Sequence, residues 1–164
     1  MNIDSLKALL TDLDPATLLP ELEPLTGKLQ SIAHFVVVIG PILLLALGLT
    51  YLLLSPKEAN HRFGYRCLFG MGSVEAWRFS QKLAGLVHAG LGLILLIIML
   101  LIRRGFAAME LQDMILRAGK CLLWQAGLVL FFWFATNLTV AILFDYKGNL
   151  RRDKKQQKKE KDPA

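Results

Sequence analysis

Cysteine is scarce in this sequence, and its placement excludes the classes of protein that depend on it. The chain has 164 residues but only two cysteines, Cys67 and Cys121, which lie far apart and belong to no CxxC pair. A disulfide-stapled domain needs several paired cysteines, and a structural zinc site needs closely spaced Cys or His ligands. We therefore expect neither a disulfide framework nor a bound metal.

Catalytic motifs are lacking as well. The three histidines, His34, His61 and His88, lie on different segments, and the sequence contains no HExxH motif and no paired-carboxylate arrangement. With no catalytic constellation in the chain, we expect the protein not to be an enzyme and to need no cofactor.

Charged residues are missing from three long apolar windows. Charged residues make up 20% of the chain, yet Ile32–Leu54, Leu83–Ile102 and Leu122–Phe144 contain no Asp, Glu, Lys or Arg. A helix of about 20 apolar residues crosses a hydrocarbon core of roughly 30 Å, and the windows lack the alternation of barrel strands. They predict an all-α, polytopic membrane protein with three transmembrane helices. Pro41 is expected to bend the first helix, with neighbouring helices or water satisfying the carbonyl group that its missing N–H leaves free.

The segments outside the windows divide the chain further. Residues 1–31 form an acidic leader, in which Asp4–Leu13 has the leucine spacing of a short amphipathic helix and three prolines then separate short pieces, at Pro15, Pro20 and Pro24. A poorly ordered leader is the alternative. Residues 32–146 form the transmembrane domain, with a polar loop at 55–82. Residues 147–164 form a basic tail of low complexity, which we expect to be disordered.

Lysine and arginine are distributed unevenly between the two sides of the membrane. The leader and the second loop carry six of them, whereas the loop at 55–82 and the tail carry thirteen. The positive-inside rule then places the C-terminus in the cytoplasm and the N-terminus outside, although Arg103 and Arg104 are a local counter-signal. Each basic residue of the tail would attract an anionic leaflet by about 1 kcal/mol, so membrane lipids are expected partners. Direct nucleic-acid binding is not expected, because the tail lacks aromatic residues for base stacking.

The loop at 55–82 and the helix after it hold the most informative residues. Ser73 is expected to cap a helix from Val74 to Ile102, with Glu75 in the first turn, where negative charge suits the helix dipole. One face of this helix carries a stripe of five residues, Trp77, Gln81, Gly85, His88 and Gly92. Small residues along it would let another helix approach closely. The stripe is either an intramolecular packing seam with an interfacial tryptophan or a docking face for a ligand or partner, and both can hold.

His88 lies inside the second window, where a buried polar group needs a hydrogen-bond partner. Gln125 and Asn137 in the third window are candidate partners for it. The main interpretation is a hydrogen bond between helices, worth about 1 kcal/mol or less. A proton or solute pathway is the alternative. It would require a homo-oligomer, since three helices are few for a transporter.

The motif residues of the loop are similar to the signature of a known family. In chain order they are Asn60, Phe63-Gly64-Tyr65-Arg66, Ser73, Trp77, Gln81 and Gly85. This order resembles the SdpI/YhfL proteins, integral membrane proteins of bacteria, which have an Asn, a Gly-Tyr/Ile-Arg-Thr segment, a Ser, and a Trp, a Gln and a Gly on the following helix. The likeness covers roughly residues 35–145. This chain has Cys67 and Leu68 where the family commonly has Thr and Pro, and three spans where the founding member has more.

The resemblance implies a role without catalysis in the bacterial plasma membrane. The founding member gives its producer immunity to a secreted peptide toxin that attacks membranes, and it signals by holding a small repressor protein at the membrane. Carried over, the resemblance implies a structured cytoplasmic loop that binds a partner or lipid, built from Asn60, Gly64, Tyr65, Arg66, Ser73, Trp77 and Gln81. Arg66 would bridge a lipid phosphate or an acidic partner through its planar guanidinium, or act only as a positive-inside anchor. Tyr65 and Trp77 would place their rings at headgroup depth.

These observations lead to two expectations about function. The first is an SdpI-like protein that gives immunity to, or senses, a membrane-active peptide toxin, with membrane sequestration of a cytoplasmic repressor as an added activity. The alternative is a small structural subunit of a transporter or membrane enzyme complex, which His88, Asn137 and the small residues of the second helix favour. A polytopic enzyme acting alone lacks any supporting motif.

Overall fold

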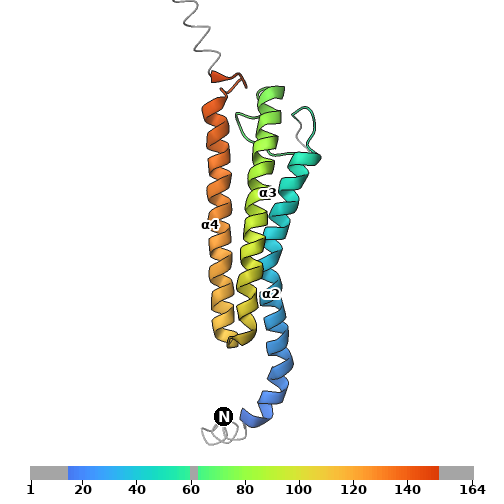
Figure 1. Cartoon of the computed structure of the whole chain (residues 1–164), viewed down its shortest axis with the longest axis vertical. Coiled ribbons are helices and arrows are strands. Elements are labelled where there is room, and N and C mark those ends of the chain that lie inside the picture. The colour runs from blue at the N-terminus through green and yellow to red at the C-terminus, as the bar shows by residue number, and fades with distance from the viewer. Residues whose placement is uncertain (1–14, 60–62, 152–164) are drawn as a thin grey trace, which may run out of the picture.

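Three long helices run side by side and are joined at alternate ends (Figure 1). The computed structural model describes residues 15–59 and 63–151. Its elements in chain order are α2 (Pro15–Leu53), α3 (Val74–Arg104), the 3-10 helix η1 (Gly105–Ala108) and α4 (Leu111–Leu143). Within these described ranges no strand forms, and one isolated antiparallel bridge pairs Phe144 with Leu150. The expected all-α class is confirmed.

Each of the three helices is long and apolar enough to cross a membrane. The candidate spans are Gly27–Leu53, Val74–Ala108 and Leu111–Leu143. By helix length and hydropathy the chain is a multi-pass membrane protein, and residues 15–59 and 63–151 contain the three predicted spans. The helices exceed the uncharged windows because they continue into the polar residues that flank them. With 31 residues, α3 is about 46 Å long at about 1.5 Å per residue, so it extends beyond a hydrocarbon core of roughly 30 Å.

The first helix begins much earlier than its apolar window. α2 is continuous from Pro15 and passes through Pro20, Pro24 and Pro41, so the expected division into short pieces is wrong. A proline φ near −65° is itself helical, and each proline removes one backbone hydrogen bond while its neighbours keep theirs. The expected amphipathic helix at Asp4–Leu13, the motif residue Asn60 and the tail after Arg151 lie outside the described residues.

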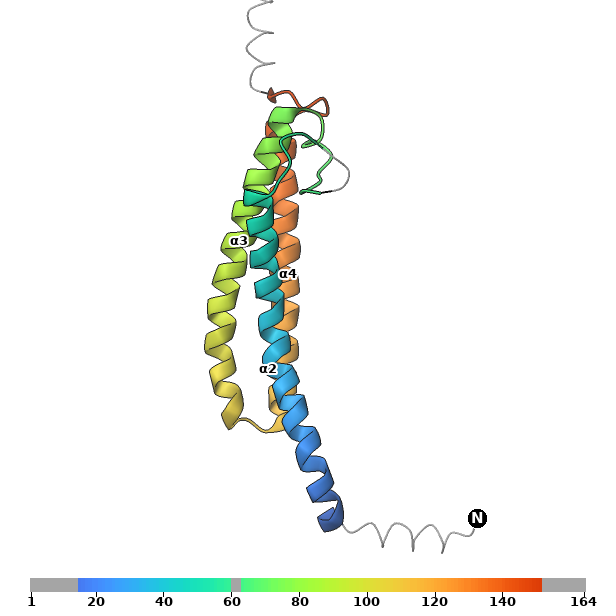
Figure 2. The ribbon, with the colours of Figure 1, turned by 90° about the vertical axis from the view of Figure 1, so that its right-hand side faces the viewer.

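The polar connections gather at one end of the bundle. Figure 2 shows the loop between α2 and α3 beside the segment that follows α4, while η1 joins α3 to α4 at the opposite end. Buried residues form one cluster near each end: the cluster beside the loop includes Tyr65, Cys67 and Phe144, and the cluster beside η1 includes Phe106. The loop is therefore part of a packed core.

A seam of small residues brings α2 close to α3, which is its main packing partner. A Cβ atom added at Gly92 would lie 2.5 Å from the backbone nitrogen of Leu45, and one added at Gly85 would lie 2.6 Å from the Leu52 side chain. A side chain at Gly48 would collide with the backbone of Ala89. These contacts confirm that the small residues permit close helix approach, as expected for helices packed in a membrane.

Candidate functional site

Residues 63–73 fold over the end of the bundle, and we call this segment the loop cap. Along it burial alternates, since Tyr65 and Cys67 are buried whereas Arg66 and Leu68 are exposed. The buried pair packs against residues of α3 and the end of α4, namely Ala76, Ala84, Val140 and Phe144. The loop cap is thus anchored on one side and displays its other side outward.

The Gln81 side chain holds the backbone of the loop cap in place. Its amide nitrogen donates to the Tyr65 carbonyl oxygen at 2.7 Å, and its amide oxygen accepts from the Tyr65 N–H at 2.7 Å. Gln81 is only 1% exposed, so these bonds form away from solvent, where an unpaired backbone group is costly. This one side chain on α3 therefore makes the pair of backbone hydrogen bonds with Tyr65 that a neighbouring β-strand would otherwise make.

Trp77 and Gly64 fit against each other beneath the same segment. The Trp77 indole nitrogen donates to the Pro56 carbonyl oxygen at 2.9 Å, and its ring is fully buried. Gly64 has a φ of 118°, which favours glycine, and a Cβ there would lie 2.8 Å from the Trp77 ring. The Tyr65 and Trp77 rings, which were expected at headgroup depth, are both enclosed by protein, so neither ring is displayed on the surface.

Ser73 joins the loop cap to the segment after α4. Its hydroxyl oxygen accepts from the Ala76 N–H at 3.1 Å, which confirms the predicted helix cap, and its hydroxyl donates to the Gly148 carbonyl oxygen at 2.7 Å. Gly148 lies in a turn in which the Asp145 carboxylate accepts from the backbone N–H groups of Lys147 and Asn149. Residues 147–151, which composition assigns to the basic tail, thus begin with a folded turn.

His88, Gln125 and Asn137 each bind a different group, so His88 does not pair with Gln125 or Asn137. The His88 ring nitrogen Nδ1 lies 2.6 Å from the Ala84 carbonyl oxygen. Since a carbonyl only accepts, Nδ1 carries the proton. The Asn137 amide donates to the Tyr65 hydroxyl oxygen at 2.8 Å, so α4 also supports the loop cap.

Gln125 completes the backbone of α2 from the facing helix. Its amide nitrogen donates to the Val37 carbonyl oxygen at 2.9 Å. Val37 lies four residues before Pro41, so this is the carbonyl whose usual partner is missing because proline has no N–H. The expectation that a neighbouring helix satisfies this group is confirmed, and Gln125 is the residue that does so.

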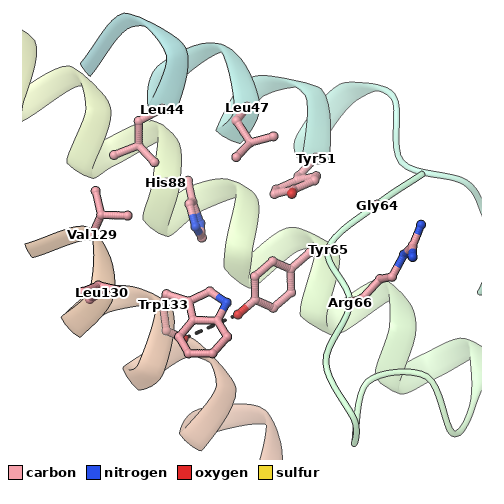
Figure 3. A pocket seen from close by; sticks show the side chains of 10 residues that line it. All are labelled: Leu44, Leu47, Tyr51, Gly64, Tyr65, Arg66, His88, Val129, Leu130 and Trp133. Atoms are coloured by element: carbon pink, nitrogen blue, oxygen red, sulfur yellow. Dashed lines mark hydrogen bonds between the residues drawn. The ribbon is translucent and has the colours of Figure 1, made fainter. Parts of the chain in front are cut away.

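A cavity of about 600 Å³ lies between α2, α4 and the loop cap, and we call it the lateral cavity. Figure 3 shows Tyr51, His88 and Trp133 pointing into it from α2, α3 and α4. Arg66 lies at its rim, with its side chain directed away from the apolar interior. The remaining wall is largely aliphatic and consists of Leu44, Leu47, Val129 and Leu130, with Gly64 and Tyr65 from the loop cap.

Burial controls the titratable groups of the loop cap. It raises the pKa of the Tyr65 phenol far above its usual value, so the hydroxyl stays neutral while it accepts from Asn137 and donates to the Trp133 carbonyl at 3.4 Å. Burial also raises the pKa of the Cys67 thiol. Within residues 15–59 and 63–151, no cluster of three or more His, Cys, Asp or Glu side chains could hold a metal ion.

The fold brings the described motif residues together, but several of their partners could not be predicted from the sequence. Gly64, Tyr65, Ser73, Trp77 and Gln81 all meet at the loop cap. Their partners on other elements, such as Pro56 and Gly148, were missed, as were the cavity residues Tyr51 and Trp133. The sequence Asp145–Asn149 carried one usable signal, since Asp, Gly and Asn favour turns.

Comparison with known protein families, curated proteins and solved structures finds no match to this chain, so its likeness to the SdpI/YhfL proteins rests on the motif residues alone.

Proposed function

We propose that this three-span protein acts without catalysis, as an SdpI-type membrane protein that gives immunity to, or senses, a membrane-active peptide. The observation that carries the proposal is that most motif residues are used to fix the loop cap, whereas one is exposed on it. Gly64, Ser73, Trp77 and Gln81 make internal contacts that fix the loop cap. Arg66 is exposed on the surface that they hold in place.

The displayed side of the loop cap suits an amphipathic ligand. The Arg66 cation is followed two residues later by Leu68, which is 70% exposed, and both lie at the end of a membrane bundle. Peptides that act on membranes lie in the interface with one apolar and one polar face. A fixed cation beside an apolar side chain is complementary to such a peptide if its polar face carries an acidic group or a terminal carboxylate.

The connection to the tail supports a signalling role. Because Ser73 bonds to Gly148, a peptide that shifts the loop cap would also move the start of the basic tail. We place both on the cytoplasmic side of a bacterial plasma membrane, following the excess of Lys and Arg there. A repressor held at the membrane would then meet the tail and the loop cap on one face.

Deleting the gene tests the proposal. Loss of the protein should raise the sensitivity of the cell to at least one secreted peptide encoded beside the gene, and expression from a plasmid should restore the original survival. Unchanged sensitivity to every such peptide would contradict the proposal.

A structural subunit of a larger complex is the second candidate, and the surface of α4 favours it. Only 11% of its most apolar window is buried, and Trp124, Phe131 and Phe134 are exposed. Lipid would cover this face in a lone bundle, whereas a partner helix would cover it in a complex. Purification in mild detergent separates the two: a stoichiometric larger partner supports the subunit role, and a lone monomer or homodimer opposes it.

A further inference from the structure

A groove runs along the bundle surface from the loop cap toward the middle of the spans. The lateral cavity forms its upper part, and a second cavity of about 400 Å³ forms its lower part. The two share Leu44, Leu47 and Val129 as lining residues, so they lie next to each other between α2 and α4. Both helices are membrane spans, and α2 packs less extensively against α4 than against α3. The groove therefore opens toward lipid.

The groove is charged at the end beside the loop cap and apolar farther along the spans, in the same order as the headgroup and acyl chains of a membrane lipid. Arg66 and Tyr51 line the end of the groove beside the loop cap, with Arg66 at the rim. Farther from the cap the wall is almost entirely aliphatic, and its one amide, Gln125, already donates to Val37. From Tyr51 to Gly40 the helix rises about 16 Å, close to half of a hydrocarbon core of roughly 30 Å. The groove is thus long enough to span one leaflet.

We propose that this groove binds one anionic phospholipid from the leaflet on the side of the loop cap. The Arg66 guanidinium engages the phosphate through its planar fork, and one acyl chain lies along α2 and α4 beside Leu44, Leu47 and Val129. The two cavities fall within the size of specific ligand sites, roughly 300–1,000 Å³. This site does not depend on the peptide role proposed above, since the lipid is always present in the membrane.

A lipid chain suits the lower groove better than a peptide does. An extended peptide would bring backbone N–H and C=O groups that need partners in an apolar environment, and the aliphatic wall provides none beyond the engaged Gln125 amide. A helical peptide has a diameter of about 10–12 Å with its side chains, so a cavity of about 400 Å³ holds only about one turn of it. An acyl chain has no polar groups to satisfy.

Native mass spectrometry of the full chain, with phosphatidylglycerol or phosphatidylcholine of identical chains added, tests the site. Both lipids carry the phosphate that Arg66 engages, but the choline cation of phosphatidylcholine offsets its negative charge. The wild type should therefore retain one phosphatidylglycerol with about tenfold preference over phosphatidylcholine, the scale of one charged contact. Arg66→Gln should lose the preference. Lys82→Gln, the same change of charge at an exposed position on α3, should keep it.

A second pair of variants tests the chain-binding part. Ala126→Phe fills the lower groove and should reduce retention of both lipids, whereas Gly127→Phe projects into open space on the same helix and should not. If Ala126→Phe does not fold, it is replaced by quenching of Trp133 by brominated phosphatidylglycerol in phosphatidylcholine vesicles. This measurement uses a Trp124→Phe background, because Trp124 is itself exposed on α4 whereas Trp77 is fully buried. This quenching should begin at a lower mole fraction than with brominated phosphatidylcholine.

Four results would overturn the inference. Equal retention of the two lipids by the wild type would contradict the selection of an anionic lipid, and an unchanged preference in Arg66→Gln would contradict the role of Arg66. Quenching of Trp133 that is equal for the two brominated lipids would show nonspecific lipid contact. If a secreted peptide bound at Arg66 while phosphatidylglycerol did not, Arg66 would belong to the peptide role alone.

Discussion

At the scale of single residues, Gln81 and Tyr65 decide whether the loop has a fixed shape. The Gln81 amide satisfies both backbone groups of Tyr65, and the Tyr65 hydroxyl in turn reaches α4 through Asn137. A loop that would otherwise depend on water for its backbone bonds is thereby tied to two helices. The outward direction of Arg66 follows from this anchoring.

Replacing Gln81 with leucine should destabilise the protein. Gln81→Leu keeps a side chain of similar size but removes the amide. The buried N–H and C=O of Tyr65 then lack partners, at a cost of about 1–3 kcal/mol each. We expect a clearly lower midpoint of thermal unfolding in detergent, measured by circular dichroism. Lys82→Gln, at the exposed neighbouring position, should leave the midpoint unchanged. An unchanged midpoint in Gln81→Leu would mean that these bonds do not hold the loop.

Cys67 should be chemically silent in the folded protein. Burial raises its pKa, and the Gly70 N–H and the Ser80 hydroxyl lower it to a smaller extent. Because the folded pKa lies above the unfolded one, the neutral thiol stabilises the fold below the unfolded pKa, and this contribution is lost as the pH rises through the folded pKa. In a Cys121→Ser background, maleimide labelling at pH 8 should be slow in mild detergent and fast after unfolding. Equal rates would contradict this burial.

At the scale of elements, the pairing of α2 with α4 depends on a proline. Pro41 leaves the Val37 carbonyl without its usual partner, and Gln125 provides one from the facing helix. The sequence could predict that Pro41 needs a donor. It could not identify the donor, because Gln125 lies 88 residues from Val37 and no local pattern links them.

A double-mutant cycle tests this pairing. Gln125→Leu should destabilise the wild type by about 1 kcal/mol, because the Val37 carbonyl is then unsatisfied. In a Pro41→Ala background the restored N–H takes over that carbonyl, so Gln125→Leu should cost measurably less. Thermal unfolding of the four proteins gives the coupling. Equal costs in both backgrounds would show that Gln125 and Pro41 act independently.

At the scale of the whole molecule, the spans were predictable and the junction of loop and tail was not. Uncharged windows of membrane length leave few alternatives to helices, because lipid satisfies no backbone group. The cap at Ser73 was also predictable, since it depends on adjacent residues. Its bond to Gly148 was not, because the two residues are 75 positions apart. For the same reason, the burial of Trp77 beneath Gly64 became visible only in three dimensions.

The orientation in the membrane is testable by cysteine labelling. In a background without the native cysteines, Ser5→Cys should react with an impermeant maleimide on intact cells, and Glu160→Cys should react only after permeabilisation. This result follows from the excess of Lys and Arg beside the loop cap and in the tail. The reverse pattern would place the loop cap outside the cell, where it could meet a secreted peptide before the peptide crosses the membrane.

The most direct test of the proposed role compares survival of host cells that hold equal amounts of the wild type, Arg66→Gln or Lys82→Gln in their membranes. The measurement is the inhibitory concentration of the secreted peptide encoded beside the gene. The wild type and Lys82→Gln should raise it, and Arg66→Gln should lose about tenfold of that protection, because one charge-assisted contact contributes on that scale. Full protection by Arg66→Gln, or none by the wild type, would contradict the account.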